Sequence, residues 1–525
     1  MLRKLTQTSA WAVYSIIVLL YVFSLWALFD QSQASPWRLA DSLFIIEHSL
    51  WQAGLSALGS TVCGLLLARA FFYLHFWGKD WLYKVMSFAC ALPSLVAIFA
   101  VIGVWGNAGW LAKTFQFFGL DWHFQLYGLQ GILIAHFFLN IPLVAKYCLT
   151  GLRLIPSNHH RLAAQLNLRH WHYFKQVELP ALKGILPYAF ATVFLICFTS
   201  FPIVLMLGGG PKYSTLEVAI YQAVTFEFDL HKAVMLIGLQ VLIGLVLQIV
   251  MDLTTRYAFS KQQTSANQEI WTAKPTGWGK WGLQAVLILH IFAILLPLAS
   301  VLWEGLSVSH LGERLQNPEL WKAALFSLLL SLIASFSVIL MVYLIALEAR
   351  QLAFKGQKLK QSILAGVVTY PLILPIFLLA VGLFMLLMEV ELSTVQLLFL
   401  VGICNGITLL PFIYRLIFSA MWNSLVSHDK LAKSLGLTGF KRWWIVEKKA
   451  LIRPLANAFA LAMSFSLGSF AVIAFFGSPD FSSLPYLLYQ QLGSYRTEDA
   501  AVTALVLMAF ALLPFLFIEQ KENLK

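Results

Sequence analysis

The chain has 525 residues, of which 60% are hydrophobic and only 11% are charged, and its mean hydropathy is +0.78. Soluble domains are close to half apolar and a quarter charged, so this composition excludes a soluble protein and indicates a polytopic membrane protein in a lipid bilayer. The net charge of +12 does not indicate nucleic acid as a partner, because the basic residues lie in short loops between apolar runs.

Apolar runs long enough to cross a hydrocarbon core of about 30 Å recur along the whole chain. The fold class we predict is an all-α polytopic membrane protein with about 12 transmembrane helices. The first run follows Arg3 and Lys4, is long enough to span and lacks a small-x-small cleavage site, so we expect a membrane helix and not a signal peptide. The predicted spans are 11–29, 50–73, 85–106, 129–149, 184–206, 231–253, 281–303, 320–346, 362–388, 394–418, 452–476 and 498–518.

The distribution of Lys and Arg between the loops predicts the orientation of the chain. With both termini in the cytoplasm, the loops that carry most of the basic residues all fall on the cytoplasmic side. The opposite side then holds only a few basic residues, namely Arg38, Lys113, Lys212, Arg314 and Arg496. We therefore expect both termini, and the polar stretch near Gln263, to be cytoplasmic.

One polar segment occurs twice, from Asn158 to Leu182 and from Ser427 to Leu451, with an offset of 269 positions. The offset superposes identical residues at several positions, including Glu178 on Glu447. The matched pairs are Leu162 with Leu431, Ala163 with Ala432, Leu166 with Leu435, Leu168 with Leu437, and Ala181-Leu182 with Ala450-Leu451. A surface element that recurs between apolar runs in both halves of a membrane protein suggests a docking site.

Each copy is predicted to form a short helix, a break and a second helix. Asn158 and Ser427 are good N-cap residues. The leucines of each copy are spaced i, i+4 and share one helix face. Asn167 and Gly436 fall at the same position, and these residue types most readily adopt the left-handed conformation that ends a helix. The second helix would carry Trp171 and Phe174 in the first copy, and Phe440 and Trp443 in the second.

The spacing of both copies resembles the EAA loop of ABC-importer permeases, in which E-A-A-x-x-x-G precedes a proline at a fixed interval. In the first copy those places are occupied by Arg161-Leu162-Ala163, Asn167 and Pro180. In the second copy they are occupied by Lys430-Leu431-Ala432, Gly436 and Lys449. The sequence departs from the family pattern because the Glu is basic in both copies, the first Gly is Asn and the second Pro is Lys. The resemblance implies that residues 161–163, 166–167, 430–432 and 435–436 couple the membrane protein to a cytoplasmic ATPase.

The resemblance and the repeat together predict two tandem six-helix type I ABC-importer permease halves. Further matched residues support the repeat, among them Trp51 with Trp321, Pro142 with Pro411 and Gly208 with Gly477. An even number of spans between equivalent positions makes the repeat parallel. We expect an N-terminal transmembrane helix and periplasmic segment (1–48), a first permease domain (49–253), a cytoplasmic linker (254–280), a transmembrane helix and periplasmic segment (281–318), a second permease domain (319–518) and a cytoplasmic tail (519–525).

No catalytic constellation stands out, and G-x-x-x-x-G-K-[ST] is absent, so we expect no enzyme activity of the chain itself. The five scattered cysteines show no spacing for a metal site or disulfides, and we expect no cofactor.

Polar residues inside membrane spans are costly, so they are candidates for lining a translocation path. The candidates are His136 and Asn140, which are spaced i, i+4, and Asn405, which is at the position that matches His136. The alternative is interhelical hydrogen bonding. Gly208-Gly209-Gly210-Pro211 is predicted to form a turn and not a phosphate cradle.

A closer resemblance, over nearly the whole chain, is to the fused two-half permeases that import thiamine and thiamine pyrophosphate across the inner membrane of Gram-negative bacteria. It rests on the segments YGLQGILIAHFFLNIPL (127–143), LGGGPKYSTLEVAIYQA (207–223) and LPYLLYQQLGSYRTEDAAVTAL (484–505). The resemblance implies a homodimeric cytoplasmic ABC ATPase and a periplasmic thiamine-binding protein as partners. Alternatives are a fused ferric-iron permease, which shares the architecture, and a six-plus-six-helix secondary transporter, which should carry intramembrane carboxylates. A membrane-embedded enzyme should cluster His, Asp or Glu at one membrane face.

Overall fold

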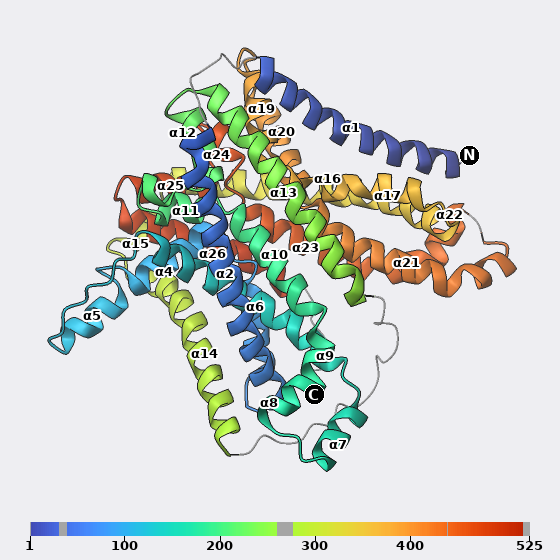
Figure 1. Cartoon of the computed structure of the whole chain (residues 1–525). Coiled ribbons are helices and arrows are strands. Elements are labelled where there is room, and N and C mark those ends of the chain that lie inside the picture. The colour runs from blue at the N-terminus through green and yellow to red at the C-terminus, as the bar shows by residue number, and fades with distance from the viewer. Residues whose placement is uncertain (1, 31–38, 260–276, 438, 518–525) are drawn as a thin grey trace. The chain divides into compact units, whose positions relative to one another are not determined.

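The computed structural model describes residues 2–30, 39–259, 277–437 and 439–517, and every regular element in those ranges is a helix (Figure 1). Nine of the described helices are long and apolar enough to cross a membrane, or up to eleven if each of two bent pairs is one span. A helix satisfies all its backbone hydrogen bonds internally, which is what an apolar segment in lipid requires. The predicted all-α membrane fold is confirmed.

The described residues form two compact units, which do not follow the order of the chain. One unit comprises residues 39–218, 242–259 and 277–304, and we call it the first-half unit. Its helices are α2 (Leu39–Tyr73), α3 (Lys79–Ala89), α4 (Ser94–Trp105), α5 (Trp110–Phe117), α6 (Leu129–Arg153), α7 (Ser157–Gln165), α8 (His170–Tyr173), the π-helix η1 (Phe174–Glu178), α9 (Leu179–Leu182), α10 (Ile185–Phe198), α11 (Pro202–Leu207), the 3-10 helix η2 (Pro211–Tyr213) and most of α14 (Gly277–Leu306).

The other unit comprises residues 2–30, 219–241, 305–437 and 439–517, and we call it the second-half unit. Helix α12 (Leu216–Thr225) belongs mainly to it, and α13 (Leu230–Phe259) is divided between the two units. Its other helices are α1 (Leu2–Asp30), α15 (Leu311–Leu315), α16 (Pro318–Phe354), α17 (Lys358–Gly366), the 3-10 helix η3 (Val367–Thr369), α18 (Tyr370–Ile373), α19 (Ile376–Leu387), α20 (Thr394–Thr408), α21 (Leu410–Ser434), α22 (Gly439–Arg442), the π-helix η4 (Trp443–Glu447), α23 (Lys448–Leu467), α24 (Ile473–Phe476), α25 (Leu484–Gly493) and α26 (Thr497–Phe517).

The same helix pairing organises both units. In the first-half unit α2 packs along α6 and α10, and in the second-half unit α16 packs along α20 and α23. Glycines permit the close approach: a Cβ on Gly64 of α2 would lie 2.6 Å from Val144 of α6, and a Cβ on Gly402 of α20 would lie 2.7 Å from Ile333 of α16. Small residues at such crossings let membrane helices approach closely, although here the glycine is on opposite partners in the two units.

Several of the predicted spans are interrupted. The run 85–106 is divided between α3 and α4 before Pro93, and the run 362–388 is divided before Pro375 between the short helix α18 and α19. Proline disfavours helical conformation in the preceding residue, and Leu374 is extended (φ −85°, ψ 124°). The runs 184–206 and 452–476 are also broken, between α10 and α11 and between α23 and α24.

The proline that the repeat shares has different effects in the two units. Pro142 lies inside the continuous helix α6. Its counterpart Pro411 is near the start of α21, which makes an angle of 62° with α20. Inside α6 Pro142 removes one intrahelical hydrogen bond, whereas Pro411 in the first turn of α21 removes none, because the N–H groups of a first turn have no intrahelical partner.

Candidate functional site

The first copy of the repeated polar segment forms α7, which ends in a Schellman motif. The N–H of Leu168 donates to the carbonyl of Ala163 at 2.9 Å, and the N–H of Asn167 donates to that of Ala164 at 3.1 Å. Asn167 is left-handed, with φ 51°. These two bonds satisfy carbonyls that the end of a helix otherwise leaves unpaired.

The second copy ends its helix in the same way. The N–H of Leu437 donates to the carbonyl of Ala432 at 2.9 Å, and the N–H of Gly436 donates to that of Lys433 at 3.1 Å. Gly436 has a φ of 63°. The left-handed conformation predicted at Asn167 and Gly436 is therefore confirmed, and it redirects the chain identically in both units.

The predicted N-caps are wrong. Helix α7 starts at Ser157 after the N-cap Pro156, so Asn158 lies inside the first turn, and Ser427 lies in the middle of the continuous helix α21. The physical reason is Pro156, which separates α7 from α6 by excluding helical conformation at the residue before it. The matching position in the second copy is Leu425, a good helix former, so nothing interrupts that helix.

We call α7 and the last turns of the continuous helix α21, residues 427–434, the two short helices, and each turns an alanine inward and two leucines outward. Ala163 is 2% exposed and Ala432 is 1% exposed, and both lie in the core beneath their helices. The four leucines that were predicted to form an apolar face are all more than half exposed, namely Leu162, Leu166, Leu431 and Leu435. Arg161 and Lys430 are also exposed beside them. Each unit thus presents a small apolar ridge flanked by a basic residue.

The second helix of each copy contains a π-helical turn, η1 or η4, at matching positions. Each π-turn ends at a buried glutamate, Glu178 or Glu447. A π-turn is rare and is often found at functional sites. The side chain of Phe440 lies outside the described part of the chain, whereas Trp443 donates from Nε1 to the hydroxyl of Tyr343 at 2.6 Å.

In the first-half unit a buried chain of contacts connects α7 with the long helix α2. His160 of α7 is hydrogen-bonded through Nδ1 to the hydroxyl of Tyr173. Tyr173 lies 3.4 Å from the hydroxyl of Tyr73, which donates to Glu178 at 2.8 Å. Glu178 forms an ion pair with Arg69 of α2 at 2.8 Å. Burial, together with the nearby His159, lowers the pKa of His160 to about 4, so this imidazole is neutral at pH 7.

In the second-half unit the matching positions are charged. Asp429 replaces His160 and accepts from Arg442, the counterpart of Tyr173, at 2.8 Å. Arg442 also lies 3.2 Å from Glu447, which pairs with Arg350 of α16 at 2.7 Å. The route from the short helix to the long scaffold helix is therefore the same in both units, but it is mostly neutral in one and ionic in the other.

The arginine partners were missed by sequence reasoning, although the superposition of Glu178 on Glu447 marked the acids. Arg69 and Arg350 do not occupy matching positions in the repeat, so the offset gives no signal for them. The available signal is that each is a basic residue near the end of a long apolar helix, where a charge needs a partner or an exit to water.

The candidate translocation residues of the first half are buried and make interhelical contacts. His136 of α6 lies 2.9 Å from the hydroxyl of Ser56 and 3.1 Å from that of Ser200. Asn140 donates to the sulfur of Cys197 at 3.3 Å. These contacts connect α6 with α2 and with the break that follows α10.

The second half repeats one of these contacts. Ser469, the counterpart of Ser200, donates to Oδ1 of Asn405 at 2.9 Å. In both halves the polar residue therefore fixes the broken helix to its neighbour, as the hydrogen-bonding alternative expects. A role of His136, Asn140 and Asn405 in the translocation path stays a prediction. Within the described ranges, no three His, Cys, Asp or Glu side chains gather as metal ligands would.

Comparisons with known proteins agree with this architecture. The model of the family described as "Binding-protein-dependent transport system inner membrane component" matches residues 60–257 and 349–519. The chain is 43% identical over 512 residues to the thiamine transport system permease protein ThiP of Haemophilus influenzae, covering 96% of this chain and 94% of that protein. It is 37% identical to the protein of the same name from Escherichia coli, covering 92% and 90%, and 35% identical to that from Brucella abortus, covering 90% and 85%.

Proposed function

This chain belongs to the family of binding-protein-dependent transport system inner membrane components, and on that premise we propose that it transports thiamine and its phosphate esters into the cell. The observation that carries the proposal is that relatives named as thiamine transport permeases match at least nine-tenths of the chain. The chain is the multi-pass membrane subunit of an ABC importer and not itself an enzyme. No observation favours ferric iron or a secondary transporter.

We propose that the energy comes from two copies of one cytoplasmic ABC ATPase, each docked on one short helix. The exposed leucine ridges of α7 and of the end of α21 support this, because each offers an apolar surface on a rigid, capped helix. The residues that would form the contact are Arg161, Leu162, Ala163, Leu166 and Asn167, with Lys430, Leu431, Ala432, Leu435 and Gly436. Since Arg161 and Lys430 stand where the family usually has Glu, the ATPase groove should offer an acidic or polar partner there.

The buried routes to α2 and α16 give these helices a means to transmit motion. The second short helix is continuous with the rest of α21, whereas α7 would absorb the movement of a docked ATPase if it were attached only through flexible loops. Through Tyr173 in one unit and Arg442 in the other, each short helix is linked to the ion pair at Glu178 or Glu447, which holds the longest helix of its unit. We infer that nucleotide-driven closure of the ATPase pair moves the two permease halves through these contacts.

Orientation and domain organisation are part of the proposal. Both termini and the linker, residues 254–280, would lie in the cytoplasm. Along the chain, one permease domain (49–253) would precede the linker and the other (319–518) would follow it. The described part of the chain excludes residues 260–276 of that linker. A periplasmic thiamine-binding protein would deliver substrate to the opposite face.

Uptake of radiolabelled thiamine tests the substrate directly. A strain that lacks its own thiamine importer would express this chain with its ATPase and binding protein. Uptake that needs all three components, and that unlabelled thiamine pyrophosphate inhibits, supports the proposal. Uptake of ferric iron without thiamine would overturn the substrate while leaving the ABC-permease assignment in place.

A further inference from the structure

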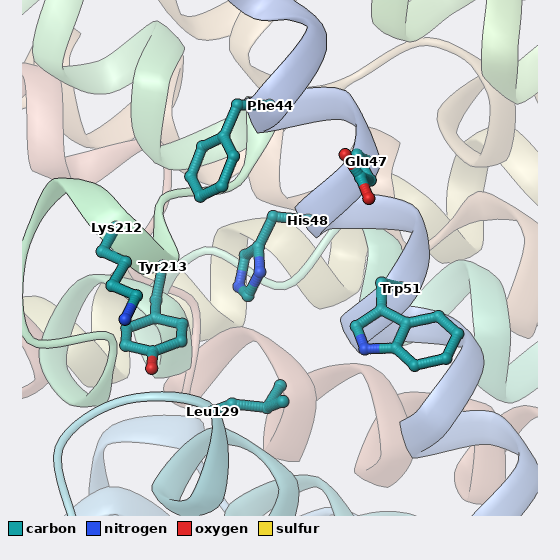
Figure 2. Close-up of a pocket in the computed structure, with 7 residues that line it drawn as sticks. All are labelled: Phe44, Glu47, His48, Trp51, Leu129, Lys212 and Tyr213. Carbon is teal, nitrogen blue, oxygen red and sulfur yellow. The ribbon is translucent and has the colours of Figure 1, made fainter.

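A cavity of about 410 Å³ lies in the first-half unit, where α2 begins (Figure 2). Four of its lining residues are Phe44, Glu47, His48 and Trp51, which share one face of α2. Its other walls are Leu129 at the start of α6 and the pair Lys212 and Tyr213 in η2. The cavity volume is within the range of small-ligand sites, and the lining combines aromatic rings with one acid and one base.

Glycines hold the wall that carries Lys212 and Tyr213 in place. Gly209 has a φ of 68° and Gly128 a φ of 122°, conformations that side chains rarely adopt. The N–H of Gly128 donates to the carbonyl of Leu207 at 2.7 Å, and a Cβ on Gly128 would lie 3.0 Å from the ring of Tyr213. The glycine run predicted as a turn therefore also presents Tyr213 to the cavity.

His48 is the feature that indicates a ligand. Its side chain is 9% exposed, and its ring stacks on Phe44 and meets the edge of Tyr213 at centroid distances of 6.4 and 5.4 Å. Its Nε2 has no hydrogen-bond partner among the described residues. A buried polar atom without a partner is costly, and Figure 2 shows His48 in the middle of the cavity lining, where a ligand would supply that partner.

We propose that this cavity binds the headgroup of a membrane phospholipid that carries a phosphate and a primary amine. The Lys212 ammonium, held 5.5 Å from the centroid of the Tyr213 ring, would pair with the phosphate, and His48 Nε2 would hydrogen-bond to it. Glu47 would accept from the amine. In Figure 2 Lys212 and Glu47 lie on opposite sides of His48, which matches the separated charges of such a headgroup.

The surroundings of the cavity favour a lipid over a soluble phosphate ester. The face of α2 that lines the cavity continues as a row of exposed apolar side chains, of which Trp51 and Leu58 are 61% and 56% exposed. This row offers acyl chains an apolar surface directly beside the headgroup site. A Trp, a Tyr and a Lys close to a helix end are also typical of the membrane–water interface.

The second half of the chain does not repeat this site. The N–H of Leu484 donates to the hydroxyl of Ser327 as that of Leu216 does to Ser49, which fixes the matching positions. There Phe326 replaces His48, and Asp480 and Phe481 replace Lys212 and Tyr213. The permease scaffold therefore does not require these side chains, and the site is a feature of the first half alone.

Native mass spectrometry of the purified full chain tests the proposal. The detergent-solubilised protein is titrated with phosphatidylethanolamine or with phosphatidylglycerol of the same acyl chains. We expect a saturable preference for phosphatidylethanolamine that Lys212→Gln and His48→Phe each reduce about tenfold, the size of losing one charge-assisted hydrogen bond. Phenylalanine keeps the aromatic stacking of His48 and removes only its nitrogens.

Lys113→Gln is the matched control, because Lys113 is an exposed base of the same unit whose nearest acid, Glu304, lies 3.9 Å away outside the cavity. Its lipid binding should equal that of wild type. Equal binding of both lipids, or unchanged binding by Lys212→Gln and His48→Phe, would overturn the proposal. Displacement of the bound lipid by thiamine pyrophosphate would also overturn it, since the site would then belong to a soluble phosphate ester.

Discussion

The ion pair between Arg350 and Glu447 offers a quantitative test of how the second short helix is held. The two side chains are 5% and 4% exposed and lie 2.7 Å apart. At an effective dielectric of about 20, Coulomb attraction at that distance is about 6 kcal/mol before desolvation is subtracted. Replacing Arg350 with Met leaves a buried carboxylate with Arg442 alone, and removing one partner of a buried pair typically costs about 3–5 kcal/mol. At roughly 2 °C per kcal/mol, the melting temperature should fall by about 6–10 °C.

A double-mutant cycle separates this pair from general effects of mutation. Arg350→Met, Glu447→Leu and the double variant are purified in the same detergent, and their unfolding is followed by the fluorescence of native tryptophans. The double variant should melt well above Arg350→Met, because it leaves no unpaired buried charge. If Arg350→Met melts within about 1 °C of wild type, or if the double variant is the least stable of the three, the pair does not hold the helix as argued.

Three further predictions concern the loops and the orientation of the chain. Burial lowers the pKa of His160 to about 4 from an ordinary value near 6.5. Between these two values the imidazole is protonated in the unfolded loop but not in the folded one, so the stability of α7 is complete above pH 6.5 and falls between pH 6.5 and 4. Amide exchange in 157–165 should therefore speed up by about tenfold per pH unit below 6.5, relative to 430–434, and His160→Gln should abolish that step. Gly436→Val forces a β-branched residue to a φ of 63°, so it should lower transport while the chain still inserts normally. Asn167→Gly should leave transport unchanged. Uptake assays in membranes with equal protein levels measure both effects. A single cysteine at position 212 should react with an impermeant reagent in intact cells and one at position 263 should not, and the reverse pattern would invert the topology.

The sequence predicted the elements that depend on local chemistry. Asn167 and Gly436 are left-handed because few other residues tolerate that conformation, so residue type alone was sufficient. The leucines at i and i+4 were correctly assigned to one face because that spacing is close to one helical turn. The N-caps failed because the start of a helix depends on what precedes it, and Pro156 has no counterpart at Leu425.

The features that depend on tertiary packing were not predictable. Pro93 and Pro375 are visible in the sequence, but whether a proline kinks a span or divides it depends on neighbours that can take over its lost hydrogen bond. The offset that superposes Trp51 on Trp321 also superposes Tyr73 on Tyr343. Arg69, the ionic partner of Glu178, is four residues before Tyr73, whereas Arg350, the partner of Glu447, is seven residues after Tyr343. Only the folded chain brings such positions together, so a repeat in the sequence does not disclose them.

The central claim is that the leucine ridges of the two short helices bind the ATPase, and pull-down of the assembled complex tests it most directly. Leu162→Asp combined with Leu431→Asp places a charge on each ridge, and both positions are exposed, so the permease should fold normally. Leu359→Asp, at an exposed leucine of α17 outside both loops, is the control. We predict that the double variant loses the ATPase and substrate-stimulated hydrolysis while the control keeps two ATPase copies per chain. Wild-type stoichiometry and hydrolysis in the double variant would contradict the account.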